Sequence, residues 1–103
     1  HLVNSNILQK LGKNSFLINI ARGSVIDQQA LIHALQNKII CGAGLDVFEN
    51  EPNVPDDLMN LDNVILTPHI GSATVETRYD MGKLVYDNVV QMLTKESTIS
   101  PVN

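Results

Sequence analysis

The feature that most constrains this chain of 103 residues is the alternation of short apolar runs with segments of helical pattern. The apolar runs cover residues 15–20, 39–47 and 64–67. The expected helices cover residues 5–11, 28–37, 56–61 and 74–93. Such alternation is typical of right-handed crossovers between parallel strands. We therefore expect an α/β fold, and the continuous apolar runs favour strands that are covered on both faces.

Local signals predict where several of these elements begin and end. Asn4 and Asp27 are expected N-caps of the first two helices, and Gly12 is the expected stop after the first. Leu8 and Leu11 should both turn inward from that first helix. Gly42 and Gly44 are costly inside a strand, so they indicate close approach by a backbone or a ligand.

Composition narrows the possible partners and compartments. The net charge of −4 argues against nucleic acid and against an anionic membrane surface. No apolar stretch approaches the roughly 20 residues of a membrane helix. The single cysteine, Cys41, cannot form an internal disulfide, which fits the cytoplasm, and we expect it to be a small core residue. The histidines lack metal-ligand spacing, so no metal site is expected.

Three polar residues, Arg22, Glu51 and His69, stand just past the ends of the three apolar runs. If the runs are parallel strands of one sheet, these side chains come from loops on the same edge. Open α/β sheets bind their ligands at that edge. An arginine, a carboxylate and a histidine gathered there could hold an anionic substrate and move a proton.

Each of these residue types suits one part of such chemistry. The planar fork of a guanidinium such as Arg22 matches a carboxylate, and Gly23 beside it would leave room for a small ligand. Histidine titrates close to neutral pH, which suits His69 to proton transfer. A carboxylate bonded to its ring would fix the tautomer and stabilise the protonated form. Spacing alone does not choose Glu51 over Glu49 for this role.

From the residue types alone, roles outside catalysis remain open for each of these side chains. Arg22 could be a surface arginine, the acidic loop could simply be solvated, and His69 could be satisfied by backbone groups. Asp46, at the end of the second run, should accept hydrogen bonds if it is buried, and it could equally brace only its own loop. No Gly-x-Gly-x-x-Gly turn follows a strand in this sequence.

Three linked segments closely resemble the D-isomer-specific 2-hydroxyacid dehydrogenases, in the order in which that family has them. They are Leu-Ile-Asn-Ile-Ala-Arg-Gly-Ser-Val-Ile-Asp at 17–27, Gly-Ala-Gly-Leu-Asp-Val-Phe-Glu-Asn-Glu-Pro at 42–52, and Asn-Val-Ile-Leu-Thr-Pro-His-Ile-Gly-Ser at 63–72. Residues 53–55 and 72–78 resemble the glyoxylate/hydroxypyruvate reductases of this family most. Phosphoglycerate dehydrogenase is the nearest competitor.

The resemblance implies a role for each site residue. Arg22 would bind the substrate carboxylate and carbonyl, Glu51 would pair with the histidine, and His69 would be the acid/base. Asp46 would lie by the nicotinamide ring. The implied cofactor-binding residues are Ile20, Ala21, Arg22, Asp46, His69 and Gly71.

The resemblance also implies how the chain is organised. It would be the second half of a doubly wound parallel-sheet, Rossmann-type nucleotide-binding domain. Residues 1–93 would form the C-terminal, incomplete part of the NAD(P)-binding domain. Residues 94–103 would be a tail that packs on a substrate domain absent from this chain. We expect the chain alone to be inactive.

The implied function is hydride transfer between NAD or NADP and a small 2-keto or 2-hydroxy acid, such as glyoxylate or hydroxypyruvate. The parent protein would be a cytoplasmic homodimer that uses no nucleic acid, membrane or metal. The alternatives are a corepressor-type NAD-binding regulatory protein of the same fold and a phosphoglycerate dehydrogenase.

Overall fold

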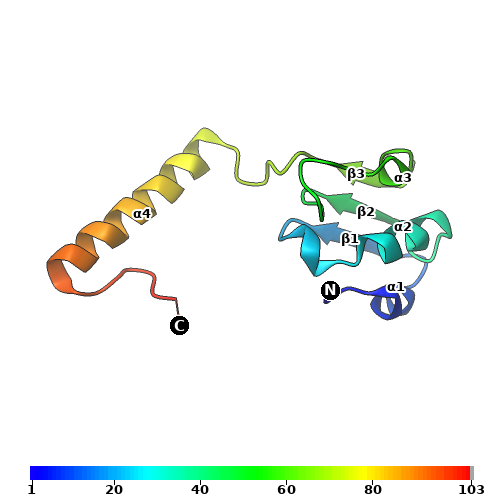
Figure 1. Cartoon of the computed structure of the whole chain (residues 1–103), viewed down its shortest axis with the longest axis horizontal. Helices are drawn as coiled ribbons and strands as arrows, with labels where there is room; N and C mark the ends of the chain where they lie inside the picture. The colour runs from blue at the N-terminus through cyan, green and yellow to red at the C-terminus, as the bar shows by residue number, and fades with distance from the viewer. Residues whose placement is uncertain (103) are drawn as a thin grey trace. The chain divides into compact units, whose positions relative to one another are not determined.

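The structure, a computed structural model, describes residues 1–102 (Figure 1). The chain divides into two compact units, the first covering His1–Gly71 and the second beginning at Ser72. The sheet and the three shorter helices lie in the first unit. The second unit contains the long helix. The sequence also predicts a boundary after residue 93, beyond which the tail would pack on another domain. This boundary stays a prediction.

The first unit is built on a parallel sheet of three strands in the order β1-β2-β3 (Figure 1). These strands are β1 (Phe16–Asn19), β2 (Gly42–Leu45) and β3 (Val64–Leu66). In the register, Leu17 lies opposite Ala43, and Leu45 lies opposite Leu66. The predicted α/β class with a parallel sheet is therefore confirmed.

Helices connect these strands at the positions that the sequence predicts. They are α1 (Ser5–Leu11), α2 (Gln28–Gln36) and α3 (Asp56–Met59), with a short 3-10 turn at Gly23–Val25. Asn4 caps α1, because its side-chain oxygen accepts from the amides of Asn6 and Ile7. Asp27 caps α2 in the same way through the amide of Ala30.

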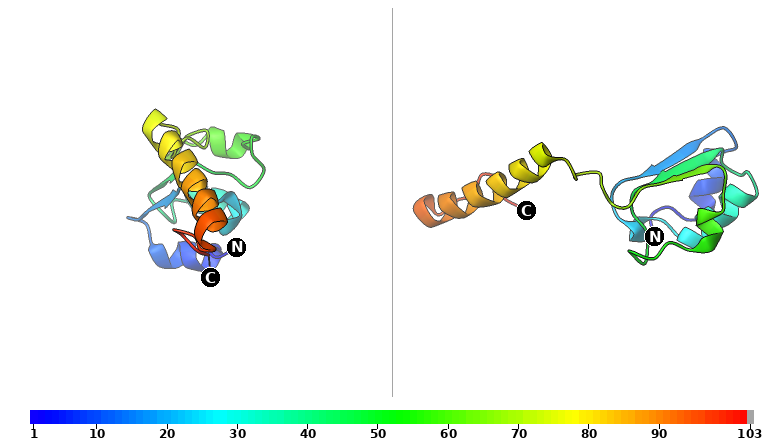
Figure 2. Two further views of the ribbon diagram at one scale, coloured as in Figure 1. Left: turned by 90° about the vertical axis from the view of Figure 1, so that its left-hand side faces the viewer. Right: turned by 90° about the horizontal axis from the view of Figure 1, so that it is seen from above.

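The core of the first unit lies between one face of the sheet and the three helices, which cover that face together (Figure 2). Its fully buried members come from α1, α2, the end of the loop before β2, and α3; they are Leu8, Leu31, Leu35, Ile40 and Leu58. Burial of one such side chain contributes about 1.5–3 kcal/mol. The core therefore fixes the strands, and with them the loops that follow each strand.

The prediction that the strands are covered on both faces is wrong within this chain. On the second face, Phe16, Ile18 and Ile65 remain 68%, 66% and 72% exposed. The reason is that α1, α2 and α3 contribute to a core on the same side of the sheet. Apolar sequence runs report what a strand can bury, and they do not say which neighbouring elements cover it.

Three smaller expectations concern single residues. Leu11 and Cys41 are exposed, so neither is the inward residue that we predicted. Cys41 lies at a bend, one residue before β2 begins. Close approach at Gly42 is confirmed, since a Cβ there would lie 2.7 Å from the backbone oxygen of Asn63.

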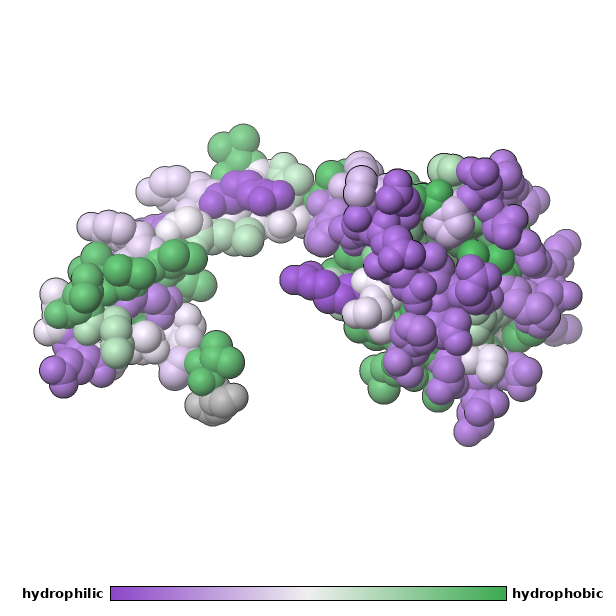
Figure 3. All heavy atoms as spheres, in the orientation of Figure 1, coloured by the Kyte–Doolittle hydropathy of each residue, from purple (hydrophilic) through white to green (hydrophobic). Residues whose placement is uncertain are grey.

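The second unit consists of α4 (Val75–Lys95) and the tail that follows it. Thr74 caps α4 through the amide of Thr77, and Asn88 binds the tail through the amides of Ile99 and Ser100. None of the α4 residues is buried, and their apolar side chains are visible on its surface (Figure 3). Over residues 1–102, no helix combines the length and the apolar character that a membrane crossing requires.

Candidate active site

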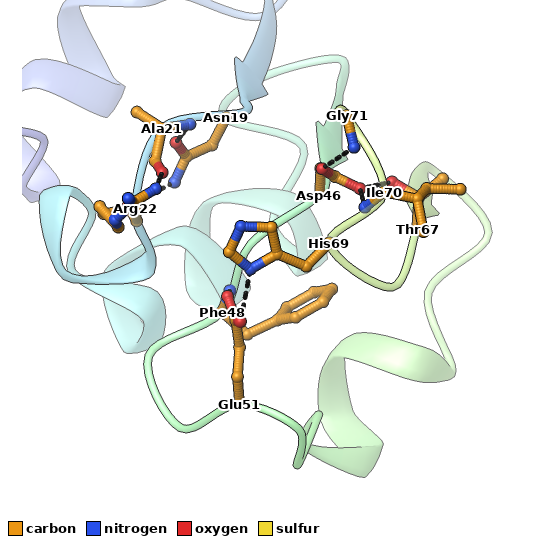
Figure 4. A network of polar contacts seen from close by, with 10 residues as sticks. All are labelled: Asn19, Ala21, Arg22, Asp46, Phe48, Glu51, Thr67, His69, Ile70 and Gly71. Carbon is orange, nitrogen blue, oxygen red and sulfur yellow. Dashed lines mark hydrogen bonds and ion pairs between the residues drawn. The ribbon is translucent and has the colours of Figure 1, made fainter. Parts of the chain in front are cut away.

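The three predicted site residues come from the loops that leave the carboxyl ends of the three strands. Arg22 follows β1, Glu51 follows β2 and His69 follows β3. Because the strands are parallel, these loops meet at one edge of the sheet, where α/β folds bind ligands. Figure 4 shows the ring of His69 between the loop of Arg22 and the side chain of Glu51.

His69 and Glu51 form a close pair. The Nδ1 atom of His69 lies 2.6 Å from Oε2 of Glu51, and the second oxygen, Oε1, accepts from the amide of Phe48 at 3.0 Å. The hydrogen bond with His69, followed by that from Phe48, holds the pKa of Glu51 below its usual range. The carboxylate is therefore ionised at neutral pH, and both of its oxygens are fixed.

The structure brings Glu51, and not Glu49, to the histidine. Glu49 turns toward the start of the chain, where its Oε1 lies 3.0 Å from Nε2 of His1 and accepts from the amide of Gln28. Spacing along the chain could not separate these two acids, because both belong to one short loop. Their different directions come from the partners on which the loop packs.

Asp46 braces the loop that carries His69 on both sides. Its Oδ1 accepts from the hydroxyl of Thr67 at 2.5 Å and from the amide of Ile70 at 2.9 Å, and its Oδ2 accepts from the amide of Gly71 at 2.8 Å. These donors, the Thr67 hydroxyl first, lower the pKa of Asp46. The bracing matters because His69 has a φ of +54°, in the left-handed region that a side chain rarely adopts.

Arg22 lies on a loop that is held by buried partners, although its own side chain is exposed. Its Nη1 donates to the carbonyl of Ala21 at 2.7 Å. The side chain of Asn19, at the end of β1, bonds both Ala21 and Arg22. The positive charge of Arg22 also contributes to the lowered pKa of Glu51.

The expectation that Gly23 leaves room for a small ligand is wrong. A Cβ at this position would lie 2.0 Å from the carbonyl carbon and oxygen of Phe48. The space is filled by the loop that carries Glu51. Glycine is therefore needed here so that the loops after β1 and β2 can pack directly on each other.

Sequence reasoning did not single out Asn19, Phe48 or Thr67 as parts of this site. Asn19 offered a signal, because a polar residue inside an apolar run needs partners once it is buried. Phe48 acts through its backbone amide, and Thr67 acts through a contact with Asp46. The residue type at these two positions therefore does not predict a role in the site.

A small hollow of about 140 Å³ flanks the pair of His69 and Glu51. Its remaining walls are Phe48, Pro52, Val54 and Pro68. These walls are largely apolar, and the side chains of His69 and Glu51 remain 47% and 34% exposed. Within residues 1–102, no cluster of histidine, cysteine and acidic side chains is arranged to hold a metal ion.

Comparison with known proteins identifies relatives that share this arrangement of strands and loops. The family model of the D-isomer specific 2-hydroxyacid dehydrogenase, NAD binding domain, matches residues 1–71, which are the residues of the first compact unit. The 2-ketogluconate reductase of Gluconobacter oxydans is 49% identical over 102 residues, which are 99% of this chain and 33% of that protein. The chain thus spans about a third of the length of the relatives that it matches.

Solved structures agree with this result. The NADPH-dependent glyoxylate/hydroxypyruvate reductase of Sinorhizobium meliloti, in complex with NADP and malonate, is 51% identical, with a TM-score of 0.91. The match covers 97% of this chain and 31% of that chain. The holo form of Rhodotorula graminis D-mandelate dehydrogenase is 36% identical, with a TM-score of 0.91 over all of this chain and 30% of that chain. The chain therefore belongs to the D-isomer specific 2-hydroxyacid dehydrogenase family.

Proposed function

We propose that this chain forms the catalytic part of an oxidoreductase that interconverts small 2-keto acids and 2-hydroxy acids with NAD or NADP. The observation that carries the proposal is the 2.6 Å contact between His69 Nδ1 and Glu51 Oε2, at the sheet edge that Arg22 shares. A paired imidazole beside a guanidinium suits proton transfer to an anionic substrate. The names of the relatives, which are reductases and dehydrogenases of such acids, support this proposal.

In the direction of reduction, His69 donates a proton from Nε2, the ring nitrogen that Glu51 leaves free. The proton goes to the oxygen at C2 of the substrate as that oxygen becomes an alkoxide. Glu51 stabilises the protonated ring, because a negative carboxylate at Nδ1 favours the charged imidazole.

Arg22 binds the substrate carboxylate and the oxygen at C2. A guanidinium has five N–H donors, and the bond to Ala21 uses one, so a bidentate contact with a carboxylate remains available. Fixed positive charge beside the developing alkoxide lowers the barrier to its formation.

The residues at this edge fit the nicotinamide end of a dinucleotide. Ile20 is 74% exposed just past β1 and offers an apolar surface beside Ala21 for a flat ring. Oδ2 of Asp46 accepts one bond, from Gly71, which leaves capacity for an amide N–H. When bound there, the nicotinamide would supply or accept the hydride at C2 of the substrate. We propose that Ile20, Ala21, Asp46, His69 and Gly71 line this side of the cofactor.

Glyoxylate and hydroxypyruvate are the proposed substrates. The test is an assay of the complete polypeptide that carries this chain. We expect oxidation of NADH or NADPH that depends on glyoxylate, hydroxypyruvate or 2-ketogluconate. Turnover of 3-phosphoglycerate with NAD alone would favour a phosphoglycerate dehydrogenase. Cofactor binding without turnover of any of these acids would contradict the proposal and favour a corepressor-type regulator.

A further inference from the structure

Asn19 is a buried polar residue, 5% exposed, at the end of β1. Its amide group is bonded on both sides. Nδ2 donates to the carbonyl of Arg22 at 3.0 Å, and Oδ1 accepts from the amide of Ala21 at 3.1 Å. An asparagine supplies both a donor and an acceptor in one plane, which neither an aspartate nor a leucine can do.

These two bonds form a closed set with a third, in which Nη1 of Arg22 donates to the carbonyl of Ala21 at 2.7 Å (Figure 4). The carbonyl that the guanidinium contacts belongs to the peptide group between Ala21 and Arg22. Asn19 bonds the peptide groups immediately before and after it. The side chain of Asn19 therefore fixes the orientation of the peptide group on which the guanidinium rests.

A second restraint acts on the same loop from the other side. Gly23 packs against the backbone of Phe48 so closely that a Cβ could not be placed there. The loop thus cannot retreat toward the loop of Glu51. The carbonyl of Arg22 also accepts from the amide of Val25 at 3.2 Å, so the peptide group before Ala21 is the one that depends most on Asn19. Rotation of that peptide group is the motion that the bonds of Asn19 oppose.

We propose that Asn19 is a positioning residue that sets the direction of the Arg22 guanidinium for the substrate carboxylate. The inference rests on the proposed role of Arg22 in substrate binding. It goes beyond a structural role, because a merely structural asparagine would affect stability and leave substrate affinity unchanged.

The chain offers a matched control in Asn63, at the opposite end of the strands. Nδ2 of Asn63 donates to the carbonyls of Leu35 and Cys41, both at 3.2 Å. Asn19→Leu and Asn63→Leu each leave backbone groups without a side-chain partner, and neither variant introduces a charge. Both should lower stability, but only the first lies on the loop of Arg22.

The test measures kcat, KM and cofactor affinity in the complete polypeptide. We expect Asn19→Leu to raise KM for glyoxylate about tenfold, with a smaller change in kcat. The reason is that the amide of Ala21 loses its acceptor, while the carbonyl of Arg22 keeps only the amide of Val25 as a donor. Cofactor affinity should change less than KM, because Ala21 is only one of the residues proposed to line the cofactor, and the pH profile should stay as in the wild type. Asn63→Leu should leave KM within about twofold. An unchanged KM in Asn19→Leu, or an equal rise in both variants, would overturn the inference.

A second measurement needs neither a variant nor activity. In the wild-type 103-residue chain, the amide of Ala21 should exchange with deuterium at least about tenfold more slowly than that of Arg22, for which residues 1–102 provide no acceptor. Equal exchange would refute the anchoring by Asn19 whatever the activity. Slow exchange in a polypeptide without reductase activity would refute the proposed function and leave the anchoring of the loop standing.

Discussion

At the scale of single residues, the site depends on an asymmetry of the His69 ring. Nδ1 is committed to Glu51, so only Nε2 is free to exchange a proton with a substrate. Glu51 can hold this position at neutral pH because its pKa is lowered by His69 and by the amide of Phe48. A glutamine at position 51 could occupy the same space, but it would carry no charge to stabilise the protonated ring.

Glu51→Gln therefore tests the pair directly. We expect kcat/KM for glyoxylate reduction to fall by about 10²-fold, because the protonated ring loses its anionic partner. Glu49→Gln is the matched control, since Glu49 lies in the same loop but contacts His1 and Gln28 instead. Equal kcat/KM for Glu51→Gln and the wild type would show that the pair has no role in proton transfer.

The three main residues of the site can be predicted from the sequence, because the topology of a parallel sheet determines where they lie. Arg22, Glu51 and His69 follow three apolar runs, and parallel strands bring residues at such positions to one edge. Asn19 and the packing of Gly23 could not be predicted in the same way. Their roles depend on contacts across the fold, with the loop peptides and with the backbone of Phe48.

At the scale of elements, the loops after β1 and β2 behave as one layer because Gly23 and Phe48 touch through their backbones. Gly23→Ala should destabilise the fold by about 1–3 kcal/mol, since the added methyl group forces the loops apart. Urea unfolding measures this loss. Gly82→Ala in α4 is the control, because a Cβ there meets nothing within 4 Å, and it should be neutral or stabilising. Equal stability of Gly23→Ala and the wild type would contradict the close packing of the loops.

The loop between β3 and α4 should be sensitive to acid. Hydrogen bonds from Thr67, Ile70 and Gly71 lower the pKa of Asp46 on folding, so the unfolded chain binds protons more readily than the folded one. Stability should therefore be fully present above about pH 4, the ordinary carboxyl range, and should fall as the pH drops through the lowered value.

Asp46→Asn removes this titration. The variant should lose less of its unfolding free energy between pH 6 and pH 3 than the wild type does, as measured by urea titrations at each pH. The comparison uses the pH dependence within each protein, because the substitution also changes stability at neutral pH. An equal or steeper fall in Asp46→Asn would show that Asp46 does not drive the acid sensitivity.

Helices and their ends were predicted more closely than the surroundings of the strands. The caps of α1 and α2 are local, and Asn4 and Asp27 bond amides two or three residues ahead. Which face of β1 is covered depends instead on where the crossovers place distant helices. The exposed Phe16 and Ile18 could not be foreseen from an apolar run alone.

At the scale of the whole molecule, the chain spans about a third of its relatives' length. The sequence has no Gly-x-Gly-x-x-Gly turn after a strand to bind the dinucleotide phosphates. We therefore predict that the purified 103-residue chain binds NAD and NADP weakly and does not reduce glyoxylate. Titration calorimetry and an assay at high protein concentration test this. Measurable reductase activity of the chain alone would contradict it.

The homodimer, the cytoplasmic location and the docking of the tail stay predictions for the parent protein.

The most direct test of the central claim compares the wild type with His69→Gln in the complete polypeptide. The account predicts reduction of glyoxylate or hydroxypyruvate by the wild type and a fall in kcat of about 10²–10⁴ in the variant, with cofactor affinity retained. His33→Gln, on the exposed face of α2, is the control and should keep full activity. Equal turnover by His69→Gln and the wild type would contradict the claim that this edge of the sheet is the active site.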